Sequence, residues 1–219
     1  FLVGELFRRI DGRSLGAALA EDVTGPLGAE VFIGLPVALH DRVAEFYWPG
    51  EPAPEREPEG LGEAELMEFN GYYNPSGLSG AGVVNTAAWR SAEIPSTNGH
   101  GTARGVARLY AALAAGGSLG DVQVIDAPTL GLFSSERVAG PDLILHRPSR
   151  FGLGFQLTQP ERPLGPGRRA FGHFGAGGSL GFCDPDANLA FGYLINSMGS
   201  RWQNPRNGAL IDAVFDSIG

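Results

Sequence analysis

The sequence predicts an α+β fold in which a helical region precedes an antiparallel sheet and a closing helix. Within residues 1–149 several segments carry apolar side chains at the three- and four-residue spacing of helices, with a linker and turn-rich chain between them. From residue 150 short apolar segments alternate with turns rich in glycine and proline, which is typical of strands. Because strands follow helices instead of alternating with them, an α+β arrangement is favoured over a parallel α/β sheet. We assign 1–149 to the helical and loop region and 150–219 to the strands and terminal helix of one domain.

The N-terminal part is expected to contain several short helices. A helix over 1–10 is predicted by one apolar stripe, formed by Leu2, Val3, Leu6 and Ile10. Ser14 is a suitable N-cap for a second helix over 15–22. Further helices are expected at 38–46, at 62–69 and after Pro128.

Two segments frame the middle of the chain. Residues 49–60 contain four prolines and four glutamates, a composition that predicts an exposed linker. The clearest helix follows at about 103–115, with Thr102 as its N-cap and Gly116-Gly117 as its end.

The C-terminal part is expected to form four strands and a helix. The predicted strands are Phe151–Leu157, Ala170–Phe174, Leu180–Cys183 and Leu189–Ile195. The polar run 184–188 is suited to an antiparallel hairpin between the last two strands. A helix at about 206–218 is expected to bury its apolar face on the sheet.

Composition excludes several classes of function. All 16 basic residues other than histidine are arginine, so the chain has no lysine for a Schiff base, a phosphate-binding loop or a Ser-x-x-Lys pair. The 24 acidic residues give a net charge of −8, and an acidic chain without a basic run is not expected to bind nucleic acid. The single cysteine, Cys183, excludes an internal disulfide, and no metal site or cofactor is predicted.

Hydropathy predicts no transmembrane segment, because no apolar run approaches the 18 residues that a membrane-spanning helix needs. A cytoplasmic location is favoured. An export signal would have to precede residue 1, because the chain opens without methionine and within a predicted helix.

Ser179 lies in Gly177-Gly178-Ser179-Leu180-Gly181, which matches the G-x-S-x-G nucleophile elbow of α/β-hydrolases. An elbow requires a helix after the serine, followed by an acid and then a histidine. Here a strand is predicted after Ser179, and no histidine follows it. The preferred interpretation is a small polar residue at the entrance of a strand, with an α/β-hydrolase as a third alternative.

A more specific pattern surrounds His173. The run 171–179, Phe-Gly-His-Phe-Gly-Ala-Gly-Gly-Ser, lies on a predicted strand and precedes the hairpin. It resembles the C-terminal half of the serine β-lactamase-like family, which includes class C β-lactamases, penicillin-binding-protein-like peptidases and related carboxylesterases. In that family a Lys-Thr-Gly or His-x-Gly motif lies on the strand that edges the active site, as His173-Phe174-Gly175 would here.

Three further segments are similar to the same family in the same order. Residues 2–14 look like the helix that follows the family's Tyr-x-Asn-type motif, and 25–28 look like its Pro-Leu-Gly turn. Residues 98–104 and the alanine-rich helix after them look like the segment that leads to the sheet. The resemblance spans about residues 1–218 and implies a β-lactamase/transpeptidase-like fold.

The resemblance also implies roles for individual residues. The N–H of Ala176, the residue after His-x-Gly, would be one of two donors to the oxyanion of an acyl-transfer intermediate. His173 would lie where many relatives hold lysine, and a largely neutral histidine favours neutral esters over carboxylate-bearing β-lactams. The residues expected to contact substrate are Gly175, Gly177, Gly178, Ser179 and His100.

The family's nucleophile is the serine of Ser-x-x-Lys, and its tyrosine lies upstream of the first helix of this chain. Without lysine, the resemblance implies the C-terminal portion of a serine hydrolase that acts on a small ester or amide. The nucleophile, lysine and tyrosine would come from a missing N-terminal segment or partner chain, so the chain alone is an incomplete domain and is expected to be inactive. The alternative is a non-catalytic relative that binds a ligand or regulates another protein.

Overall fold

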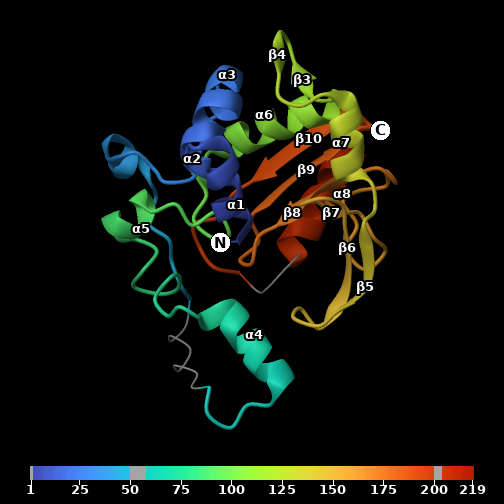
Figure 1. The fold of residues 1–219 in the computed structure, drawn as a ribbon. Helices are drawn as coiled ribbons and strands as arrows, with labels where there is room; N and C mark the ends of the chain where they lie inside the picture. Colours follow the sequence, from blue (N-terminus) through green and yellow to red (C-terminus); the bar gives the residue numbers. More distant parts are fainter. Residues whose placement is uncertain (1, 50–57, 200–203) are drawn as a thin grey trace.

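The computed structural model describes residues 2–49, 58–199 and 204–219, and it confirms the α+β fold (Figure 1). One antiparallel six-stranded sheet forms its centre, with the strand order β10-β9-β8-β7-β6-β5. Each strand therefore pairs with its neighbours in sequence. The strands are β5 (Val138–Asp142), β6 (Arg147–Phe151), β7 (Gln156–Leu157), β8 (Phe171–Phe174), β9 (Leu180–Asp184) and β10 (Leu189–Tyr193).

Helices make up most of the remaining regular structure. The α-helices are α1 (Leu2–Asp11), α2 (Leu15–Ala18), α3 (Gly25–Leu27), α4 (Glu63–Tyr73), α5 (Ala87–Ser91), α6 (Ala103–Ala114), α7 (Ala127–Ser134) and α8 (Pro205–Ile218). A π-helical segment (Leu19–Thr24) follows α2, and a 3-10 helix spans Val37–Arg42. Two small ladders pair β1 (Val31–Phe32) with β2 (His100–Gly101) and β3 (Ser118–Leu119) with β4 (Val122–Gln123).

The two faces of the sheet carry separate apolar cores, because successive strand residues point to opposite faces. On one face α6 and α7 pack on β7, β8 and β9 through a cluster that includes Tyr110 and Phe171. On the other face α8 packs on β8 and β9 through a cluster that includes Ile211, Phe174 and Phe182. Figure 1 shows α6 and α8 on these two sides of the strands. His173 alternates with Phe174, so it shares the face of Phe171 and α6.

Two glycines allow α6 to approach the sheet closely. Gly181 and Gly192 are paired across β9 and β10, and His173 pairs with Gly181 on the next strand. A β-carbon at Gly181 would overlap the Tyr110 ring, and one at Gly192 would overlap the backbone of α6 at Ala103. His173, Gly181 and Gly192 thus form one row across β8, β9 and β10, and α6 packs over the two glycines. His173 is exposed because it lies beyond the part of this face that the helix covers.

Local sequence signals for the helices are confirmed at their N-termini. The Ser14 hydroxyl accepts a hydrogen bond from the Ala17 N–H at 3.2 Å, and Thr102 accepts one from the Gly105 N–H at 3.0 Å. The segment after Pro128 belongs to α7, whose N-cap is Asp126. Helix α4 begins close to the predicted 62–69 and continues to Tyr73.

Several predicted boundaries are wrong. The strands of the six-stranded sheet begin at Val138 and not at residue 150, because β5 and β6 form a hairpin whose prolines and charged residues hide the strand pattern. The strand predicted at Phe151–Leu157 is interrupted between β6 and β7, where Gly154 adopts φ +90° in a turn. The helix predicted at 38–46 is a 3-10 helix that ends at Arg42. Most of the linker predicted at 49–60 lies outside the described residues.

Among the described residues, the apolar face of α1 and the β10 edge of the sheet are not covered by another element. None of the residues of α1 is buried, and Leu2, Val3 and Ile10 are 88%, 81% and 79% exposed. At one side of the sheet β10 is the edge strand. In the part of the chain that the structure describes, no helix has the length and apolar content needed to span a bilayer.

Candidate active site

The candidate site is the loop that joins β8 to β9. Gly175 donates its N–H to the Ser179 carbonyl at 2.7 Å, which extends the antiparallel pairing by one step. Within the loop, the Gly178 N–H donates to the Gly175 carbonyl at 3.1 Å and closes a β-turn over residues 175–178. Gly178 has φ +115°, a conformation that a side chain would strain. The loop is therefore a tight, internally bonded turn.

This turn determines where the Ala176 N–H points. In a trans peptide the C=O and N–H are opposed, and the Gly175 carbonyl points into the turn toward Gly178. The N–H of Ala176 belongs to the same peptide unit, so it points away from the turn. Ala176 is solvent-exposed. The N–H is thus directed out of the turn at the end of β8, on a residue that is exposed to solvent.

His173 lies two residues before the loop on β8 and is exposed to solvent. Although solvent reaches the side chain, neighbouring protein atoms desolvate the imidazole, and this lowers its pKa below the ordinary value. An interaction with the Phe174 backbone opposes the shift, whereas the positive charges of Arg162 and Arg147 add to it. His173 is consequently a neutral imidazole at neutral pH, with two guanidinium groups nearby.

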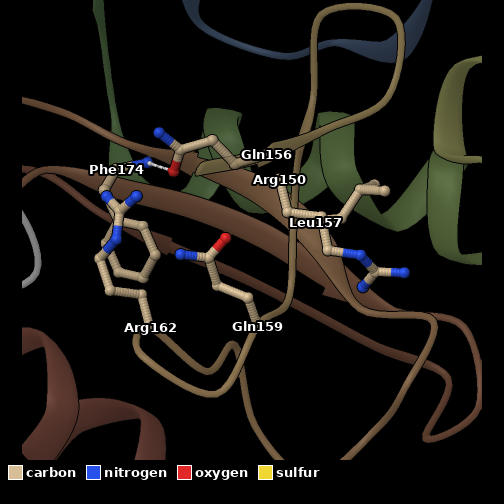
Figure 2. A pocket seen from close by; sticks show the side chains of 6 residues that line it. All are labelled: Arg150, Gln156, Leu157, Gln159, Arg162 and Phe174. Carbon is tan, nitrogen blue, oxygen red and sulfur yellow. Dashed lines mark hydrogen bonds between the residues drawn. The ribbon is translucent and has the colours of Figure 1, made fainter. Parts of the chain in front are cut away.

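The backbone of β8 is also supported from β7. The Phe174 N–H donates to Oε1 of the buried Gln156 side chain at 3.3 Å (Figure 2). A small pocket lies beside this bond, lined by Arg150, Gln156, Leu157, Gln159, Arg162 and Phe174 (Figure 2). Gln159 and Arg162 both donate to the Pro148 carbonyl, at 3.0 and 3.4 Å. These contacts fix Arg162 near the strand that carries His173.

The three glycines predicted to contact substrate differ in their surroundings. The nearest atoms to a β-carbon at Gly175 would belong to Ser179, at 3.4 Å, which is an ordinary van der Waals contact. Gly177 and Gly178 are buried. A β-carbon on Gly177 would lie 2.7 Å from Ile195 and Met198, and one on Gly178 would overlap Asn204. For Gly177 and Gly178 the close approach is therefore made by the chain itself and not by an open substrate channel.

Ser179 does not lie in a nucleophile elbow. It follows a turn between two antiparallel strands and precedes β9, whereas an elbow requires a helix after the serine. Its Oγ accepts a hydrogen bond from the Ile195 N–H at 3.3 Å. The geometry confirms the strand-entrance interpretation and excludes the α/β-hydrolase alternative.

His100 has neighbours different from those of His173. It pairs with Phe32 in the β1–β2 ladder, and its ring lies 5.5 Å from that of Trp89 in α5. Burial lowers its pKa, and the charges of Arg90 and His40 act in the same direction. The strand residue that pairs with His173 belongs to β9. The contacts of His100 described above therefore do not bring the two histidines together.

Three residues that no sequence motif connects with the loop hold it from outside. The Asn204 and Arg206 side chains donate to the Gly177 carbonyl at 3.4 and 3.3 Å, and Asn207 donates to the Gly178 carbonyl at 2.7 Å. All three belong to the start of α8, where Asn204 is the N-cap. The Asn-Pro-Arg-Asn run signals a helix N-terminus, but its contact with the loop depends on tertiary structure.

Among residues 2–49, 58–199 and 204–219 there is no group of three or more histidine, cysteine, aspartate or glutamate side chains that could hold a metal ion. What this end of β8 offers is a backbone N–H directed out of the turn, and a neutral imidazole three residues earlier on the same strand. Such an arrangement is suited to stabilising negative charge on an external oxygen.

The antiparallel sheet between helices is the architecture of the β-lactamase/transpeptidase-like class of folds, which solved structures share with this chain. The model of the β-lactamase family matches residues 1–215, and the chain therefore belongs to the β-lactamase family. This confirms the family resemblance predicted from the motifs around His173.

Individual relatives agree with this assignment. The chain is 31% identical over 203 residues to the esterase/beta-lactamase LipL of Mycobacterium tuberculosis (strain ATCC 25618 / H37Rv), an alignment that covers 90% of this chain and 46% of LipL. A penicillin-binding protein homologue from Caulobacter crescentus has 40% identity and a TM-score of 0.83 over 99% of this chain and 56% of that one. A family VIII carboxylesterase has 36% identity and a TM-score of 0.85, with coverage of 98% and 55%. The chain thus spans about half the length of the relatives it matches.

Proposed function

We propose that the polypeptide containing this chain is a serine hydrolase that cleaves small esters through an acyl-serine intermediate. The observation that carries the proposal is the outward N–H of Ala176, which is available because the Gly175 carbonyl is bonded inside the turn. When a serine hydroxyl adds to an ester carbonyl, that carbonyl oxygen becomes an oxyanion. Removing one preorganised donor to such an oxyanion costs about 3–4 kcal/mol of barrier.

In the proposed reaction the ester carbon forms a bond to the serine oxygen and then loses the alcohol, which leaves with a proton. Water hydrolyses the acyl-serine in a second addition and elimination, and the carboxylic acid is released. Ala176 donates its N–H to the oxyanion in both additions, with the N–H of the nucleophilic serine as the second donor. Gly175 leaves room for the acyl group beside the strand, because it has no β-carbon.

The nucleophilic serine, its lysine and the tyrosine are proposed to come from a segment outside these 219 residues. The absence of lysine supports this proposal, as do the half-length match to the relatives and the exposed apolar face of α1. An exposed apolar face and a free strand edge are features that another segment commonly covers. The chain alone is accordingly proposed to be inactive.

The preference for neutral esters is proposed from His173. Its lowered pKa keeps the ring uncharged at neutral pH, so His173 does not supply the cation that a lysine would offer to a substrate carboxylate. The esterase/beta-lactamase and carboxylesterase named above support ester hydrolysis as the reaction. Arg162 and Arg147 lie near enough to lower the pKa of His173, and each carries a positive charge that a substrate carboxylate would attract. A carboxylate-bearing substrate is therefore the comparison that tests the preference for neutral esters most directly.

The test uses the full-length polypeptide that carries this chain. We expect a fluorophosphonate probe to label it, and short-chain p-nitrophenyl esters to be turned over faster than penicillins or cephalosporins. Ser179→Ala is the matched control and should still be labelled, because Ser179 is not the proposed nucleophile. Absence of labelling and turnover would favour the non-catalytic ligand-binding alternative. Faster turnover of the β-lactams would overturn the preference for esters.

A further inference from the structure

The start of α8 holds two consecutive carbonyls of the candidate loop. The Gly177 carbonyl accepts from the Asn204 amide, the Arg206 guanidinium and, at 3.0 Å, the Gly199 N–H. The Gly178 carbonyl accepts from the Asn207 amide at 2.7 Å. Asn207 is fully buried and Asn204 is 5% exposed, so solvent does not compete readily for these bonds.

The bonds to Gly177 act on the direction of the Ala176 N–H through two peptide units. The Gly177 carbonyl and the Gly178 N–H belong to one planar peptide, so fixing the carbonyl also fixes the direction of that N–H. The Gly178 N–H in turn holds the Gly175 carbonyl at 3.1 Å. That carbonyl shares its peptide with the Ala176 N–H. The direction of the proposed oxyanion donor is therefore coupled to the start of α8.

Asn207 supports the same arrangement in two ways. Its Nδ2 fixes the peptide after Gly178, and its Oδ1 accepts the Asn204 N–H at 3.2 Å. Asn204 accepts the Arg206 N–H on its own Oδ1 at 3.1 Å while its Nδ2 faces Gly177. Each asparagine thus uses its acceptor to close the helix N-terminus and its donor to hold the loop.

We propose that Asn204, Arg206 and Asn207 are positioning residues that aim the N–H of Ala176 at the oxyanion of the substrate. The effect of these residues on catalysis rests on the proposed function. Their hydrogen bonds to the loop do not depend on that function. A misaimed donor weakens transition-state binding more than ground-state binding, because negative charge on the oxygen develops only during the addition.

Asn207→Asp tests the proposal in the full-length polypeptide. The substitution keeps the size of the side chain and the Oδ1 acceptor but removes the donor to Gly178. We expect kcat for p-nitrophenyl ester hydrolysis to fall by about 10- to 100-fold while KM changes by less than about threefold. This fall in kcat is smaller than the one caused by removing an oxyanion donor, because the Ala176 N–H is misdirected but still present. Asn204→Asp keeps the helix N-cap, loses the donor to Gly177 and should act in the same direction.

Asn98→Asp is the matched control. Asn98 is also fully buried, and its amide donates to the Trp89 and Ala92 carbonyls at 2.9 and 2.5 Å while its Oδ1 accepts the Ile94 N–H. This variant loses an equivalent donor whose partners do not belong to the loop, so Tm should fall and kcat should stay within about twofold of wild type. Unchanged kcat in both Asn207→Asp and Asn204→Asp would overturn the proposal.

A second readout separates this inference from the proposed function. The amide ¹H–¹⁵N resonance of Ala176 should shift in Asn207→Asp and Asn204→Asp and should remain in place in Asn98→Asp. If the wild-type polypeptide hydrolyses no ester but the Ala176 resonance shifts as expected, the proposed function fails and the hold on the loop is supported. An unmoved Ala176 resonance in both loop-facing variants overturns the inference whatever the activity.

Discussion

At the scale of single residues, His173 combines exposure with a depressed pKa. The ring lies on β8 beyond the part of the sheet that α6 covers, so solvent reaches it. Its surroundings nevertheless remove enough water to disfavour the imidazolium, and Arg162 and Arg147 add unfavourable charge. The result is a neutral hydrogen-bonding group on β8, at a position where a lysine would be charged at neutral pH.

The influence of Arg162 on His173 can be measured directly. Arg162→Gln removes a positive charge while keeping a polar side chain of similar length, so the pKa of His173 should rise. Raising the pKa means that the imidazolium persists to higher pH, so the acid limb of kcat/KM should also move to higher pH if neutral His173 is required. An NMR titration of the imidazole gives the pKa.

Arg169→Gln is the control for this prediction. Arg169 is an exposed arginine whose ion pair is with Asp186, and it is not among the groups that shift the pKa of His173. The pKa of His173 should be unchanged in this variant. A pKa that stays constant or falls in Arg162→Gln would contradict the electrostatic explanation.

At the scale of elements, the packing of α6 depends on glycine where the helix crosses β9 and β10. Gly192 faces the backbone of α6, and a β-carbon there would lie only 2.8 Å from the Ala107 nitrogen. Backbone atoms cannot move aside as the end of a flexible side chain can. Gly192→Ala should therefore lower the free energy of unfolding by about 1–3 kcal/mol, as overpacked core substitutions do. Urea denaturation provides the measurement.

Gly208→Ala is the opposite case. Gly208 lies inside α8, and a β-carbon there would have no atom within 4 Å. Alanine is favoured over glycine within a helix, so this variant should be more stable than wild type by about 0.5–1 kcal/mol. Equal effects of the two substitutions would show that backbone entropy, and not the approach of α6, determines the outcome at Gly192.

The elements that the sequence predicted well are those with strong periodic patterns and clear ends. Helix α6 has an apolar face and a threonine cap, and β8 to β10 have apolar runs separated by tight turns. The β5–β6 hairpin was missed because both strands, Val-Ala-Gly-Pro-Asp and Arg-Pro-Ser-Arg-Phe, carry proline and neither alternates regularly between apolar and polar residues. The ladders β1–β2 and β3–β4 have two residues per strand, too few for any period.

The candidate site likewise contains residues that the sequence identifies and residues that only the structure identifies. His173 and Ala176 could be selected from the sequence because a family motif contains them. The contacts of Asn204, Arg206 and Asn207 with the loop could not, because they join segments almost thirty residues apart. Gly177 and Gly178 were assigned to substrate for a related reason: a glycine indicates close approach, but the sequence does not say which atoms approach.

At the scale of the whole molecule, the open features lie at α1 and at the β10 edge of the sheet. The apolar stripe of α1 has the spacing of a helix that packs on something, yet all of its residues are at least partly exposed. Relatives that share this fold are nearly twice as long as the chain. A covering segment elsewhere in the full-length polypeptide would account for both observations.

This explanation predicts an unusual effect of a substitution at an exposed position. Ile10 is 79% exposed and Leu143, in the turn after β5, is 73% exposed, so judged from these residues alone both should tolerate glutamine. If another segment covers α1, Ile10→Gln in the full-length polypeptide should lower the free energy of unfolding by about 1.5–3 kcal/mol, the usual value of a buried isoleucine side chain. Leu143→Gln should change it by less than about 0.5 kcal/mol, as at other open surface sites. Urea denaturation of the two variants distinguishes the cases, and an Ile10→Gln variant as stable as Leu143→Gln would mean that α1 faces solvent in the whole protein as well.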